Sequence, residues 1–295
     1  MQLTFASEPA PTGPHGPATA AARRQESRAS ADARGHKGPM NRDTPGNKRP
    51  MNGGDTPGAR VNEDLVVAGN GFVVVLDGAT APAGVESGCV HSVAWLVGEL
   101  ARQLTVPLVG GSEEPLADLL AEAITGVGRV HGGTCDLSNP DSPSSTVSIV
   151  RVCRGRLDYL VLADSPVVMR YRDKQIEVVF DDRVDLLPEY TLEAVRRLRN
   201  SPDGFWAAST ASEAAYEALA GTRDLEDLDV VAVLTDGASR YADRYGHSWS
   251  ELLELLQEEG PAELIRRVHA ADAAAPAGKY RGKRYDDATV ALWSL

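Results

Sequence analysis

Short apolar runs of the kind that form β-strands occur in groups along this chain, and amphipathic helical segments separate the groups. The runs 145–153, 157–163 and 166–172 follow one another with only short connections, as the strands of hairpins do. Grouped strands with helices between the groups are typical of α+β proteins and not of alternating βαβ units. The sequence therefore predicts an α+β fold of two packed antiparallel β-sheets flanked by helices.

The remaining elements are assigned by the period of their apolar residues. Residues 86–104 and 115–130 carry apolar side chains at three- and four-residue spacing, which indicates amphipathic helices. The other expected strands are 64–68, 71–76, 175–180, 229–234 and 287–293, and the other expected helices are 189–200, 210–220, 248–258 and 260–271.

The first 58 residues differ in composition from the rest of the chain. They are rich in Pro, Gly, Ala and Arg and have almost no aliphatic side chains after Leu3. Such a segment cannot bury enough apolar surface to offset the entropy lost on ordering. We therefore expect a disordered low-complexity tail over 1–58 and one folded domain over 59–295. Met40 and Met51 are alternative start positions.

The charge and hydropathy of the chain exclude some classes of partner. The net charge is −12, and the acidic excess lies after the basic tail. An acidic body argues against nucleic acid as the main partner. No apolar run approaches the roughly 20 residues that a membrane helix needs, and the N-terminus lacks an apolar signal core. We expect a cytoplasmic protein without a membrane partner, and the sequence leaves its oligomeric state open.

The cysteines give no clear pattern in sequence. Cys89, Cys135 and Cys153 are odd in number and widely spaced, which suggests neither a disulfide framework nor a zinc site. Free, mostly buried thiols are expected. His91 is interpreted as a helix-packing or solvent-facing side chain, with a proton donor at the active site as the alternative, and His131 has less support for a functional role.

Carboxylates at strand ends form the second informative pattern. Four acidic clusters directly precede or follow an apolar strand-like run. They are Glu63-Asp64, Asp77-Gly78, Asp236-Gly237 and Asp286-Asp287. A carboxylate near a core costs free energy unless it is paired or bound to a metal. If the clusters converge, they create an oxygen-rich site that suits Mg²⁺ or Mn²⁺, so metal-assisted hydrolysis is the leading interpretation.

These residues, taken in order, resemble the metal-dependent type-2C protein serine/threonine phosphatases, the PPM family. The resemblance extends over about residues 59–295 and depends on six short motifs in family order. The motifs are Arg60 with Glu63-Asp64, Asp77-Gly78, Ser144-Ser145-Thr146, Ala163-Asp164-Ser165, Thr235-Asp236-Gly237 and Asp286-Asp287. The resemblance implies an α-β-β-α sandwich that hydrolyses phosphoserine or phosphothreonine on a phosphoprotein substrate.

The resemblance also implies the roles of the site residues. Asp77 would bridge two Mg²⁺ or Mn²⁺ ions that share the attacking water, and the carbonyl of Gly78 would ligate one of them. The other implied ligands are Asp236 and Asp286 for the first ion, Glu63 and Asp64 for the second, partly through water, and Asp164 for a weaker third ion found in some members.

Three departures from the family pattern indicate a divergent bacterial-type member. The family often has His or Met and then Gly-Gly after Asp-Gly, whereas this chain has an unrelated loop at 79–84. Arg60, the implied phosphate-binding residue, stands three residues before the Glu and not four. No Arg follows Asp164-Ser165 directly. The alternative to an active phosphatase is therefore a catalytically weak or inactive regulatory or binding module on the same fold, and a small-molecule phosphoesterase is a third possibility.

Overall fold

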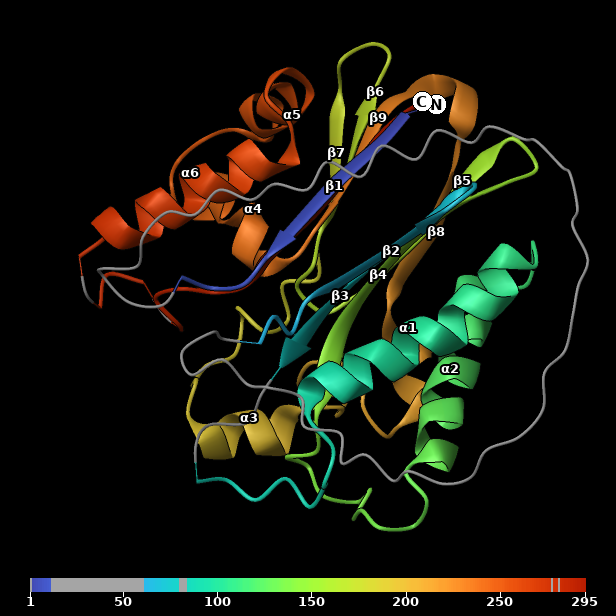
Figure 1. The fold of residues 1–295 in the computed structure, drawn as a ribbon, viewed down its shortest axis with the longest axis vertical. Coiled ribbons are helices and arrows are strands. Elements are labelled where there is room, and N and C mark those ends of the chain that lie inside the picture. Colours follow the sequence, from blue (N-terminus) through green and yellow to red (C-terminus); the bar gives the residue numbers. More distant parts are fainter. Residues whose placement is uncertain (1, 12–60, 80–83, 277, 281) are drawn as a thin grey trace, which may run out of the picture. The chain divides into compact units, whose positions relative to one another are not determined.

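Two five-stranded antiparallel sheets carry the fold in the computed structural model, which describes residues 2–11, 61–79, 84–276, 278–280 and 282–295 (Figure 1). The β9 sheet has the order β1-β10-β9-β6-β7. Its strands are β1 Gln2–Glu8, β10 Ala288–Ser294, β9 Leu228–Leu234, β6 Val167–Tyr171 and β7 Ile176–Val179. The β3 sheet has the order β2-β3-β4-β5-β8. Its strands are β2 Leu65–Gly69, β3 Phe72–Ala79, β4 Ser144–Cys153, β5 Arg156–Leu162 and β8 Leu219–Asp224.

Strand β3 shows how the sequence builds the layers. Its side chains alternate between the two faces of the sheet, as in any strand. Val73 and Val75 pack with Val231 of β9 in the core between the sheets. Val74 and Leu76 pack in a second core on the opposite face of the β3 sheet. Because both faces are covered, the strand is apolar almost without interruption up to its acidic end.

Helices cover the outer face of each sheet (Figure 1). Helices α1 Val93–Val109 and α2 Leu116–Val130 pack on the β3 sheet. Helices α4 Asp236–Asp243, α5 Trp249–Glu258 and α6 Pro261–Ala274 pack on the β9 sheet. The short helix α3 Leu192–Leu198 lies in the connection between β7 and β8. The expected α+β fold of two antiparallel sheets flanked by helices is confirmed.

Residues 2–8 form strand β1 and do not belong to a disordered tail. Gln2–Glu8 pairs with β10 along its whole length, so the expectation of disorder is wrong for these residues. Leu3 packs against the core between the sheets, and Ala6 packs against the core beneath α4, α5 and α6. An edge strand needs few apolar side chains, so its pattern in the sequence is weak. Residues 12–58 of the expected tail lie outside the described residues.

Two other elements differ from the expectation. The expected helix at 210–220 is a 3₁₀ turn at Ser212–Glu217 followed by the edge strand β8, whose side chains are mostly exposed or half-buried. The expected helix at 86–104 begins only at Val93, because Ser92 caps it by accepting a hydrogen bond from the backbone N–H of Trp95 at 3.2 Å.

Candidate functional site

The acidic residues expected at the site lie where neighbouring strands begin and end. Leu65 at the start of β2 is opposite Leu76 near the end of β3, which brings Asp64 close to Asp77. The end of β9 lies beside the start of β10, which brings Asp236 close to Asp286. The hydroxyl of Thr235 donates a hydrogen bond to Asp64 Oδ2 at 2.9 Å and so joins the two sheets at this point.

Asp77 lies close enough to four other aspartates for their charges to act on its carboxyl group. Burial raises the pKa of Asp77 well above its usual value, and nearby negative charges raise it further. Those charges belong to Asp64, Asp236, Asp286 and Asp164. The structure therefore brings together the five aspartates that the sequence analysis selected, although they are spread over more than two hundred positions of the chain.

The two carboxylate oxygens of Asp64 differ in their hydrogen bonding. Its Oδ2 accepts the Thr235 hydrogen bond, while its Oδ1 is buried and has no hydrogen-bond partner among the described residues. Burial, followed by the charges of Asp287 and Asp236, raises the pKa of Asp64 to about 7. A buried oxygen without a donor needs an explanation, and a bound cation is one of the few that satisfy it. This donor set, made of oxygen atoms only, fits Mg²⁺ or Mn²⁺.

Asp164 lies in the tight turn between β5 and β6. Ala163 before it has a φ of 66°, the left-handed conformation that glycine adopts most easily. The backbone N–H of Ala163 donates to Asp181 Oδ2 at 3.1 Å, and the hydroxyl of Ser165 is 2.6 Å from the hydroxyl of Thr146. Burial, then the charge of Asp236, raises the pKa of Asp164 to about 7.

Arg240 is a site residue that the sequence analysis missed. It lies on α4 with 1% of its surface exposed. Its guanidinium donates to Asp286 Oδ2 at 2.8 Å and to Asp272 Oδ2 at 3.2 Å. Lys283 approaches the other oxygen of Asp286, with Nζ 3.4 Å from Oδ1. The pKa of Asp286 is raised, mainly by burial, and these two cations limit the rise. Only a predicted helix after Asp236-Gly237 would have pointed to Arg240.

Asp287 has a role that its place in the Asp286-Asp287 pair does not reveal in the sequence. Its Oδ2 accepts the backbone N–H of Glu63 at 2.7 Å, and its Oδ1 accepts the backbone N–H of Ala10 at 2.7 Å. Asp287 therefore fixes the segment that carries Glu63 and ties the end of the β1 segment to the entrance of β10. Asp286 therefore belongs to the acidic cluster, whereas Asp287 holds the backbone around it.

Two positions beside the aspartates have no room for a side chain, which explains why they are glycines. A Cβ atom at Gly78 would lie 2.3 Å from Val93 Cγ1, and the N–H of Gly78 donates to the carbonyl of Glu63 at 3.2 Å. A Cβ atom at Gly237 would lie 1.9 Å from the carbonyl oxygen of Asp287. Glycine is needed at both positions because the side chain of Val93 lies directly beside Gly78 and the backbone of Asp287 directly beside Gly237.

Some expected site residues are not placed by the structure. Arg60 and loop residues 80–83 lie outside the described residues. His91 packs with its ring 3.9 Å from that of Trp95 and contacts the sulfur atoms of Cys89 and Cys135. The three cysteines are free, as expected, but the expectation that they are mostly buried is wrong, because each is partly exposed.

Within the described part of the chain, no helix combines the length and apolar character that crossing a bilayer requires.

Comparison with known proteins identifies the family. A family model described as Protein phosphatase 2C matches residues 61–269. No curated protein gives a significant match. Among solved structures, the serine/threonine phosphatase PstP/Ppp of Mycobacterium tuberculosis is 20% identical with a TM-score of 0.51, and the match covers 80% of this chain and 93% of that one.

Two further structures have the same fold. The PPM Ser-Thr phosphatase MsPP from Mycobacterium smegmatis, solved in complex with cacodylate, is 14% identical with a TM-score of 0.53, and the match covers 100% of this chain and 98% of that one. Stp1 from Staphylococcus aureus is 15% identical with a TM-score of 0.51, covering 80% and 90%. At these identities the structures show the fold, and the family model shows the relationship. The chain belongs to the protein phosphatase 2C family.

Proposed function

We propose that this chain is a metal-dependent protein phosphatase that hydrolyses phosphoserine or phosphothreonine. Membership of the family and the fold support a phosphatase activity. The observation that carries the proposal is the convergence of four aspartates on Asp77, at the junction of the two sheets. So many carboxylates cannot all be ionised side by side without cations between them.

Each carboxylate has a proposed task. Asp77 would hold both of two cations, and the carbonyl of Gly78 would be a ligand of one of them. Asp236 and Asp286 would be the other ligands of the first ion, Glu63 and Asp64 would hold the second, partly through water, and Asp164 would contribute to a weaker third site. Asp64 Oδ1 is buried and has no hydrogen-bond partner within the described part of the chain, which supports its part in this assignment.

The chemistry follows from the charges. Two bound Mg²⁺ or Mn²⁺ ions would lower the pKa of a shared water toward neutrality and neutralise charge on the phosphoryl oxygens. The protein supplies the positioning: Thr235 orients the carboxylate of Asp64, while Arg240 and Lys283 hold that of Asp286. Arg60 is proposed to bind the phosphate of the substrate, a phosphorylated protein segment.

Hydrolysis of a phosphopeptide in the presence of Mn²⁺ or Mg²⁺ tests the proposal. The wild-type protein should hydrolyse the phosphopeptide, and Asp77→Asn and Asp236→Asn should lose most of the hydrolysis rate. Asp224→Asn is a matched control, because this aspartate at the end of β8 is 57% exposed in its side chain and should keep the wild-type rate. If folded wild-type protein binds the ions without hydrolysing the peptide, a binding module is favoured instead. If it hydrolyses only small phosphate esters, a small-molecule phosphoesterase is favoured.

A further inference from the structure

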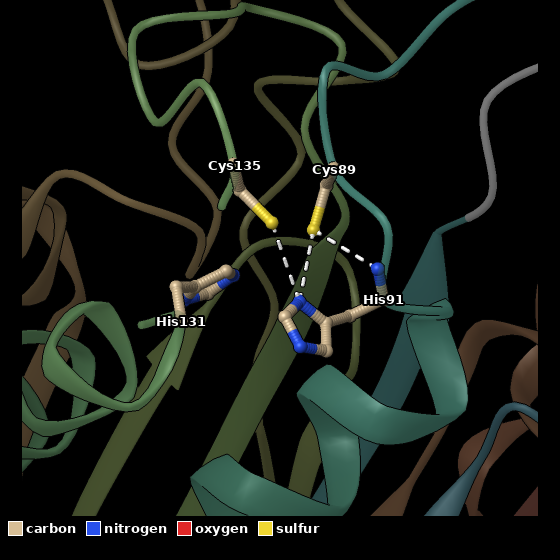
Figure 2. A group of neighbouring side chains, drawn as sticks. All are labelled: Cys89, His91, His131 and Cys135. Atoms are coloured by element: carbon tan, nitrogen blue, oxygen red, sulfur yellow. Dashed lines mark hydrogen bonds between the residues drawn. The ribbon is translucent and has the colours of Figure 1, made fainter. Parts of the chain in front are cut away.

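A second group of metal-ligand side chains lies apart from the acidic cluster. It consists of Cys89, His91, His131 and Cys135, whose ligand atoms all lie within 4.8 Å of one another (Figure 2). Cys89 and His91 belong to the segment just before α1, His131 caps the C-terminal end of α2, and Cys135 follows four positions later. The cysteines are widely spaced along the chain, which suggested no zinc site, but the packing of α1 against α2 brings these four side chains together.

Two of the distances between ligand atoms match the edges of a tetrahedron around zinc. Both sulfur atoms approach the same ring nitrogen, His91 Nδ1, at 3.5 Å from Cys89 and 3.4 Å from Cys135 (Figure 2). Around a tetrahedral zinc ion, with Zn–S of about 2.3 Å and Zn–N of about 2.0–2.1 Å, a sulfur and a nitrogen ligand stand about 3.5 Å apart. Cys89, His91 and Cys135 therefore already have the sulfur–nitrogen separations that such an ion requires, and the ligand atom of His131 lies within 4.8 Å of the other three.

The atoms around the ligands also suit a metal. The Nδ1 atom of His131 lies 2.9 Å from the carbonyl of Val127, and a proton donated there leaves Nε2 as the ligand atom. The backbone N–H groups of Val90 and His91 each donate to a cysteine sulfur at 3.4 Å. Such contacts fix a histidine tautomer and stabilise negative charge on thiolates, which is what the surroundings of a zinc site do.

We propose that Cys89, His91, His131 and Cys135 bind a structural Zn²⁺ ion. Two sulfur and two nitrogen ligands in a tetrahedral arrangement favour zinc over Mg²⁺ and Mn²⁺, which prefer oxygen. Four protein ligands close the site, so the ion stabilises structure and does not activate water.

The ion would fasten together two loops at one end of α1 and α2. Hydrogen bonds already join these loops. The backbone N–H of Asp136 donates to the carbonyl of Gly88 at 2.9 Å, and the side-chain amide of Asn139 donates to the backbone carbonyl of Glu86 at 3.1 Å. The segment that holds Cys89 and His91 follows the loop after Asp77-Gly78, so zinc would anchor the chain as it leaves the acidic cluster.

Cobalt substitution tests the proposal without reference to activity. Wild-type protein loaded with Co²⁺ in place of zinc should show strong visible bands of tetrahedral Co²⁺ and near-ultraviolet thiolate-to-cobalt charge transfer. Cys135→Ser should lose the charge-transfer intensity of one thiolate or all of it. Cys153→Ser, which changes the cysteine on β4, should leave the spectrum unchanged, and so should Asp77→Asn. Absence of charge transfer in the wild type, or equal loss in Cys153→Ser, would overturn the proposal.

Zinc release from the folded wild-type protein gives a second test that no folding defect can obscure. After dialysis against Mg²⁺, the protein should retain one zinc per chain and release it when a mercurial reagent blocks the thiols. Protein supplied with zinc that retains none, or that contains a Cys89–Cys135 disulfide when purified under reducing conditions, would contradict the site.

Discussion

Replacing Asp64 by Asn should stabilise the metal-free protein, and the gain should grow as the pH rises. Burial is the main cause that raises the pKa of Asp64 from 3.8 to about 7. Between these two values the folded protein keeps the proton and the unfolded chain has lost it. The stability contributed by the protonated group is therefore fully present below pH 3.8 and is lost as the pH rises to about 7.

The magnitude follows from the size of the shift. About three pKa units at about 1.4 kcal/mol each correspond to about 4 kcal/mol. Asn is neutral at every pH and can still accept the hydrogen bond from Thr235, so it imitates the protonated carboxyl. The free energy of unfolding of Asp64→Asn minus that of the wild type should rise by about 4 kcal/mol between pH 4 and pH 8.

Urea unfolding in the presence of EDTA measures this difference. The exposed control Asp224→Asn should show a difference from wild type that is constant with pH. Saturating Mg²⁺ should abolish the gain of Asp64→Asn, because a cation beside Asp64 favours the ionised carboxylate. A difference between Asp64→Asn and wild type that does not change with pH would refute the reasoning about burial and mutual repulsion.

Three other changes test the framework around the site. Arg240→Gln should lower the free energy of unfolding by about 3–5 kcal/mol in urea melts, because Asp272 is left as a buried charge without its cationic partner; a loss below about 1 kcal/mol would contradict this. Gly237→Ala should cost about 3 kcal/mol, the upper end of the usual range for overpacking, because its Cβ would meet the Asp287 carbonyl; an unchanged melting temperature would show that the backbone yields freely. Deleting residues 2–11 should lower the melting temperature and promote association, since β10 becomes an open edge strand; an equally stable, monodisperse product would show that β1 is dispensable.

The sequence predicts the acidic cluster well for a physical reason. Strands β3, β9 and β10 are buried on both faces, so each appears as an apolar run, and the aspartates stand where those runs begin or end. Strands β9 and β10 are adjacent and antiparallel, so Asp236 after one and Asp286 before the other meet at a common edge. Asp77 ends a strand of the other sheet, and its place beside them was expected from the order of the family motifs. The position of Arg240 needed a helix that short apolar patterns do not reveal.

The remaining features depend on tertiary contacts. Strand β1 has few apolar side chains and stands before a long segment of tail-like composition, so its pairing with β10 leaves little trace in the sequence. The ligand group of Cys89, His91, His131 and Cys135 is formed by two short pairs about 40 positions apart. The pairs Cys-x-His and His-x-x-x-Cys are each local ligand spacings, and only the packing of α1 against α2 joins them.

A calorimetric titration with Mn²⁺ tests the proposed metal centre most directly. Wild-type protein should bind two ions per chain near neutral pH and release protons as it does so, because Asp64 and Asp164 each have a pKa of about 7. Asp77→Asn should lose at least one ion and most of the proton release. Unchanged stoichiometry and affinity in Asp77→Asn would contradict the assignment of Asp77 as the bridging ligand.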